Sequence, residues 1–120
     1  MELRPKTIFC DIDGTLIKHF PPTVTCSPNF EPEILDGTVE TILVWDKKGY
    51  NIILVSGRRE SLRQQTKLQL SKLGIIYDKL ILGIGGGKRV LINDRKPDDN
   101  EDYAIAINLK RNSGIKNLDL

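Results

Sequence analysis

The stretch Phe9-Cys10-Asp11-Ile12-Asp13-Gly14-Thr15-Leu16 places two carboxylates at the end of an apolar segment and then turns at a glycine. In an extended backbone, residues two positions apart share a face, so Asp11 and Asp13 can face the same small volume. Two carboxylates held close together normally need a cation, and Mg²⁺ suits oxygen ligands and commonly takes a phosphate as a further ligand. The alternative is an ordinary Asp-Gly turn between two strands. The pair of aspartates favours a site for phosphoryl chemistry.

The order Asp11-Ile12-Asp13-Gly14-Thr15-Leu16 after an apolar strand resembles the first motif of the haloacid dehalogenase (HAD) superfamily. The resemblance implies that Asp11 is a nucleophile that forms an aspartyl-phosphate, that Asp13 is the general acid and base, and that Mg²⁺ bridges the carboxylate and the phosphate. A covalent carboxylate intermediate divides one difficult hydrolysis into two easier steps. A second carboxyl group nearby can protonate the leaving oxygen and later deprotonate water. The resemblance therefore predicts an enzyme, a Mg²⁺-dependent phosphatase, in which Thr15 helps to hold the turn.

The composition is that of an ordinary globular domain. The chain has 120 residues, of which 39% are hydrophobic and 28% are charged, so we interpret residues 1–120 as one domain with a single core. The apolar runs are too short to cross a membrane and the N-terminus lacks an apolar signal segment, so we expect a cytoplasmic protein without membrane contact. The net charge of +2 favours anionic ligands but does not indicate a dedicated nucleic-acid binder.

Strand and helix patterns alternate along the chain, which predicts an α/β fold, Rossmann-like and three-layered, with a central parallel sheet. We expect strands at about 6–11, 51–55, 78–82, 89–94 and 103–109, and helices from Asp36 or Thr38 to about 48 and over about 60–73. The continuous apolar run at 51–55 is typical of a strand buried on both faces, so it should be central. Two cysteines and one histidine show no zinc spacing, and we expect Cys10 to be buried in the first strand.

Residues 14–33 contain four prolines, too many for a regular helix, and we interpret them as a flap-like excursion. Neither this segment nor the later loops is long enough for the large cap domain that many HAD enzymes carry. The resemblance therefore implies a capless member. Capless members act on large substrates or use a neighbouring subunit as a lid, which leaves a homo-oligomer open.

Ser56, Gly57 and Arg58 follow the predicted strand 51–55 and precede a predicted helix. A hydroxyl and backbone N–H groups at such a junction can bind an anion; the alternative is that Ser56 only caps the helix. The sequence here resembles the second HAD motif, which implies that Ser56 and the Gly57 amide hold the phosphate. Arg58 either reaches the substrate or lies in solvent.

The glycine-rich stretch 83–88 ends in Lys88 and fits neither the dinucleotide-binding fingerprint nor the P-loop. We interpret it as a flexible loop that carries a cation. In the HAD pattern, a lysine from this part of the chain stabilises the charges of the nucleophile and the phosphate. Lys88 is the candidate for that role, and Lys96 is the alternative.

Asp94 ends the predicted strand 89–94, at the carboxyl edge of the sheet where ligands of α/β proteins bind. The segment resembles the fourth HAD motif, which implies that Asp94 completes a Mg²⁺ site with Asp11 and Asp13, and makes Asp98 a weaker candidate. Without the first motif, Asp94 and its charged neighbours would be interpreted as a surface turn.

The sequence thus predicts a Mg²⁺-dependent phosphomonoester hydrolase acting on a sugar phosphate or another small phosphorylated metabolite. Two alternatives remain. One is a phosphatase of nucleic-acid 3′ ends, favoured by the open site and by basic residues on one predicted helix. The other is a non-catalytic phosphate-binding or regulatory module, which would have no need for the acid/base carboxyl of Asp13.

Overall fold

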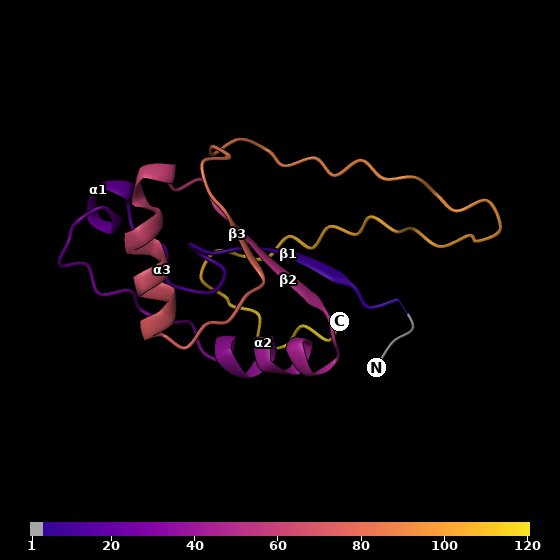
Figure 1. Cartoon of the computed structure of the whole chain (residues 1–120), viewed down its shortest axis with the longest axis horizontal. Helices are drawn as coiled ribbons and strands as arrows, with labels where there is room; N and C mark the ends of the chain where they lie inside the picture. The colour runs from indigo at the N-terminus through magenta and orange to yellow at the C-terminus, as the bar shows by residue number, and fades with distance from the viewer. Residues whose placement is uncertain (1–3) are drawn as a thin grey trace.

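The computed structural model describes residues 4–120, and its centre is a parallel sheet with the strand order β1-β2-β3 (Figure 1). The strands are β1 (Thr7–Asp11), β2 (Asn51–Val55) and β3 (Lys79–Ile81). In the register of the sheet, Cys10 lies beside Leu54, and Leu54 lies beside Leu80. The predicted α/β class with a parallel sheet is confirmed, as is the central place of residues 51–55.

The connections between the strands are helical, as the sequence pattern predicts. Helix α2 (Thr38–Lys47) connects β1 to β2, while the short 3₁₀ helix η1 (Glu60–Leu62) and helix α3 (Arg63–Lys72) connect β2 to β3. Helix α2 begins at Thr38, one of the two starts expected from the sequence, and its N-cap is Gly37, at φ 81°, a left-handed conformation that glycine adopts at low cost. Within residues 4–120, no helix combines the length and the apolar character that a membrane span requires.

One face of the sheet is buried beneath the helices. Alternate residues of a strand point to opposite faces, and Cys10, Leu54 and Leu80 point to the buried one. These side chains join Trp45 of α2 and Leu70 of α3 in one hydrophobic core. The opposite face is more open, with Phe9 54% and Ile81 40% exposed.

Burial raises the pKa of the Cys10 thiol from 9.0 to about 12, and the neighbouring Asp11 charge acts in the same direction. Above pH 9 the unfolded chain therefore loses a proton that the folded chain keeps, so the free energy of unfolding falls as the pH rises toward 12. The slope approaches about 1.4 kcal/mol per pH unit. Urea titrations of the wild type and Cys10→Ala across this range should show the extra slope only in the wild type. The exposed Cys26 provides the control, and a Cys26→Ala variant should behave like the wild type.

Several contacts tie the excursion at 14–33 to the body of the protein. An antiparallel bridge between Ile17 and Ile34 closes its base. The side-chain amide of Gln65, on α3, donates to the carbonyl oxygens of Thr25 at 3.2 Å and Ser27 at 2.9 Å. The short helix α1 (Pro22–Thr25) therefore sits beside α3 at one end of the sheet (Figure 1).

Residues 83–109, called the arm below, do not form the two strands predicted at 89–94 and 103–109. They are irregular, and Figure 1 shows them extending away from the sheet and returning. Val90 is 80% exposed and Ile92 is 89% exposed. An apolar run becomes a strand only when a neighbouring strand pairs with it, and β1 pairs with β2 alone in the described part of the chain. Four glycines among residues 83–87 make ordering this segment costly.

Candidate active site

Asp11 and Asp13 lie at the carboxyl end of β1, where the chain turns sharply. The Ile12 carbonyl oxygen accepts hydrogen bonds from the amides of Thr15 at 3.2 Å and Leu16 at 2.9 Å, which closes the turn. The Thr15 hydroxyl donates to Asp11 Oδ2 at 3.2 Å, so its side chain joins the turn to the first carboxylate. This agrees with the part that the sequence assigned to Thr15.

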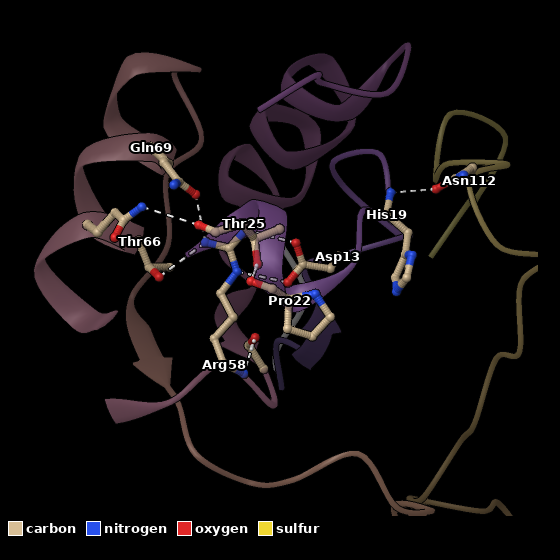
Figure 2. A network of polar contacts seen from close by, with 10 residues as sticks. Asp13, His19, Pro22, Thr25, Arg58, Thr66, Gln69 and Asn112 are labelled. Carbon is tan, nitrogen blue, oxygen red and sulfur yellow. Dashed lines mark hydrogen bonds and ion pairs between the residues drawn. The ribbon is translucent and has the colours of Figure 1, made fainter. Parts of the chain in front are cut away.

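A distant segment also holds the turn. Gly14 has φ 88°, a left-handed conformation, and its carbonyl oxygen accepts from the Asn112 amide at 2.8 Å. The Asn112 side chain in turn accepts from the His19 amide at 2.8 Å (Figure 2). The two ends of residues 14–19 are therefore fixed by one asparagine.

Asp13 forms a bidentate ion pair with Arg58. Arg58 Nε donates to Asp13 Oδ2 and Nη2 donates to Oδ1, both at 2.8 Å. The Arg58 side chain is only 6% exposed and that of Asp13 is 21% exposed. The guanidinium is buried against the second aspartate, so the alternative that Arg58 lies in solvent is wrong. Its contact with a substrate stays a prediction.

Two side chains of α3 complete this network. Arg58 Nη1 donates to Gln69 Oε1 at 2.6 Å and to Thr66 Oγ1 at 3.2 Å (Figure 2). Both partners are buried, with Gln69 6% and Thr66 0% exposed. The sequence alone does not assign either residue to the site. Two polar residues three positions apart on the buried face of a helix were the available signal.

Ser56 follows β2 immediately and lies at the same sheet edge as Asp11, because Asp11 and Val55 are neighbours in the register. It is 2% exposed, and its Oγ accepts from the Arg58 amide at 3.0 Å. A Cβ at Gly57 would lie 2.7 Å from the Gly85 carbonyl oxygen, so only glycine permits this close approach. Ser56 and Gly57 are thus beside the aspartates, and their phosphate-binding role stays a prediction.

A cation that the sequence does not point to, Arg89, contacts the first aspartate. Its Nη1 donates to Asp11 Oδ1 at 3.1 Å, and both side chains are partly exposed. Lys88 precedes it and is exposed. Lys96 lies in the arm, 3.8 Å from a carboxylate oxygen of Asp94. The role assigned to Lys88, with Lys96 as its alternative, stays a prediction.

The predicted metal ligands are only partly brought together. Asp94 and Asp98 belong to the exposed arm, and among residues 4–120 no three histidine, cysteine or acidic side chains are close enough to hold a metal ion. The Asp11 carboxylate and the Asp13 backbone carbonyl nevertheless offer the hard oxygen donors that Mg²⁺ prefers, and Mg²⁺ often takes only one or two carboxylates beside water and a substrate phosphate. The oxygen donors of Asp11 and Asp13 therefore fit Mg²⁺. Asp94, in contrast, lies in the arm and is not close to these two residues.

No family model matches the chain, and none of the curated proteins does. Solved structures do match. A chain of the Pnkp1/Rnl/Hen1 complex is 28% identical with a TM-score of 0.53, covering 72% of this chain and 30% of that chain. A chain of the Pnkp1/Rnl/Hen1 RNA repair complex is 25% identical with a TM-score of 0.55, covering 82% and 28%. This chain thus spans less than a third of the length of either.

A further match is D,D-heptose 1,7-bisphosphate phosphatase from B. bronchiseptica, complexed with magnesium and phosphate. It is 18% identical with a TM-score of 0.49, covering 79% of this chain and 53% of that chain. The two chains of the Pnkp1/Rnl/Hen1 complexes share the α/β fold of this chain, which the sequence pattern predicts. With paired aspartates at the end of its first parallel strand, the chain is similar in fold to small HAD-like phosphatases.

Proposed function

We propose that this chain is a phosphomonoester hydrolase that works through an aspartyl-phosphate on Asp11. The observation that carries the proposal is the placement of the two carboxylates: Asp11 lies at the strand end, and Asp13 is held two residues later by a buried guanidinium. A carboxylate fixed in this way is suited to proton transfer at a reacting group beside it. The HAD-like phosphatase fold of the neighbours supports the same class of reaction.

In the first step, a carboxylate oxygen of Asp11 attacks phosphorus, and the bond from phosphorus to the ester oxygen breaks. Asp13 gives its proton to the leaving oxygen. In the second step, water attacks the phosphorus of the acyl-phosphate, gives a proton to Asp13 and releases Asp11. Each carboxylate oxygen has two lone pairs, so Asp13 can take up and give back this proton while it still accepts from Arg58.

The phosphate group would lie between the ends of β1 and β2. The Ser56 hydroxyl, the Gly57 amide and the ammonium of Lys88 are its proposed ligands. Arg89 already neutralises Asp11 at this edge and would be available to a phosphate that approaches it. Mg²⁺ would be held by the Asp11 carboxylate and the Asp13 backbone carbonyl, and when bound it would offset the negative charge of the phosphate.

A sugar phosphate or similar small metabolite is the substrate that the sequence favours. A second candidate is a 3′-phosphorylated nucleic-acid end. The similarity to chains of an RNA repair complex, at 28% and 25% identity, specifically favours this candidate. The partly exposed Asp11 would also be accessible to the end of a polymer.

Phosphate release from a panel of sugar phosphates and 3′-phosphorylated oligonucleotides tests the proposal. We expect turnover that is lost in excess EDTA and restored by excess Mg²⁺. An oligonucleotide substrate would show weaker binding as salt rises, with a slope of roughly −0.7 per phosphate contacted. A sugar phosphate, which carries a single anionic phosphate group, would show a much smaller dependence on salt. Phosphate binding without release from any compound would contradict the hydrolase and support a binding module.

A further inference from the structure

Helix α3 presents two buried acceptors to a single guanidinium nitrogen. Thr66 Oγ1 and Gln69 Oε1 accept from Arg58 Nη1, whereas Asp13 accepts from Nε and Nη2. Arginine is a planar, five-donor group, so these contacts on two sides fix the plane of the guanidinium. All of these buried polar atoms are satisfied, since no described buried side-chain N or O atom lacks a partner.

The orientation of Asp13 depends on that plane. A bidentate pair aligns the carboxylate plane with the guanidinium plane. If the α3 contacts were absent, Arg58 could still pair with Asp13, but the pair could rotate together about the arginine side chain. Proton transfer is sensitive to such displacements, because an error of about 1 Å in the position of a reacting group can cost a hundredfold in rate.

We propose that Gln69 and Thr66 are positioning residues that hold Arg58, and through it Asp13, in the orientation needed for proton transfer. This inference rests on the proposed hydrolase. Neither residue touches the substrate in this scheme, so each acts on the rate of the chemical step and not on substrate binding.

The first test measures kcat and KM separately. Gln69→Leu removes the acceptor, and we expect kcat to fall at least about tenfold while KM stays within about twofold. Gln69→Glu keeps an acceptor oxygen and should restore most of kcat. Gln64→Leu makes the same chemical change at an exposed position of α3 and should leave both parameters unchanged. The thermal midpoint of each variant shows whether it is folded at the assay temperature.

A second pair of variants guards against a misfolded Gln69→Leu protein. Thr66→Val keeps the shape of the side chain and removes its hydroxyl, so kcat should fall about threefold or more. Thr66→Ser keeps the hydroxyl and should retain the wild-type kcat. Wild-type kcat in both Gln69→Leu and Thr66→Val would overturn the inference.

A measurement that does not depend on phosphate release tests the positioning role separately from the proposed hydrolase activity. The Arg58 Nε–H proton, observed by NMR, should exchange slowly with water in the wild type because it is bonded to Asp13 and buried. In Gln69→Leu its exchange should accelerate at least about tenfold, and in Gln64→Leu it should not. Unchanged exchange in Gln69→Leu would overturn the positioning role. If the wild type hydrolyses no phosphomonoester, the hydrolase fails, and the exchange rates alone decide whether α3 orients Arg58.

Discussion

Asp11→Asn is expected to keep the fold and to lose phosphate release by at least about a thousandfold, because an amide cannot act as the nucleophile that forms the acyl-phosphate. The substitution changes one oxygen to nitrogen and keeps the size of the side chain. Its remaining oxygen can still accept from Arg89 or Thr15. Circular dichroism should therefore match the wild type while phosphate release disappears.

The matched control for this variant is Asp36→Asn. Asp36 is exposed and pairs with Lys116, with a carboxylate oxygen 2.9 Å from Nζ, so the same chemical change occurs away from the site. Its rate of phosphate release should equal that of the wild type. An Asp11→Asn protein that retains more than about a tenth of the wild-type rate would assign the nucleophile to another group.

Arg58→Met should lower both stability and turnover. The substitution removes a buried cation and leaves the acceptors of Asp13, Thr66 and Gln69 without their donor. Breaking a buried pair on one side costs about 3–5 kcal/mol. Because Asp13 is partly exposed and water can replace some of the lost contacts, we expect a loss of about 2–3 kcal/mol in urea unfolding.

The kcat of Arg58→Met should fall about a hundredfold, since the orientation of Asp13 is then set by neither the guanidinium nor α3. Arg58→Lys should recover only part of this loss, because an ammonium cannot form the bidentate pair. Arg59→Met removes the neighbouring arginine, which is exposed, and should change neither quantity. Equal stability and kcat in Arg58→Met and Arg59→Met would show that the ion pair has no part in folding or catalysis.

The parts of the fold that depend on local pattern could be predicted from the sequence. The continuous apolar run of β2 predicts its central position, and the turn at Gly14 predicts where β1 ends. The strands expected at 89–94 and 103–109 do not form, because their formation depends on more than local pattern. Strand formation is a property of a pair of segments, and an apolar run such as Val90-Leu91-Ile92 does not reveal whether a partner edge will pair with it.

The network around Asp13 could not be predicted for a related reason. Arg58 lies 45 residues from Asp13 in sequence and reaches it only because β1 and β2 are neighbours in the sheet. Thr66 and Gln69 lie on the buried face of α3. The sequence pattern does not indicate that Arg58 is the hydrogen-bond donor to both side chains. Periodicity predicts which residues of a helix are buried. Which donor then forms a hydrogen bond with a buried acceptor depends on how the strands assemble into the sheet.

The turn after β1 can reach its final conformation only after Asn112, which holds it, has been synthesised. Asn112 and His19 are 93 residues apart, and a ribosome adding about 5–20 residues per second needs roughly 5–20 s to make that length. The aspartates of the first motif are therefore translated long before the residue that anchors their turn. During synthesis, β1, β2 and β3 can pair while the turn still lacks this anchor, so the motif becomes rigid well after the strand that carries it.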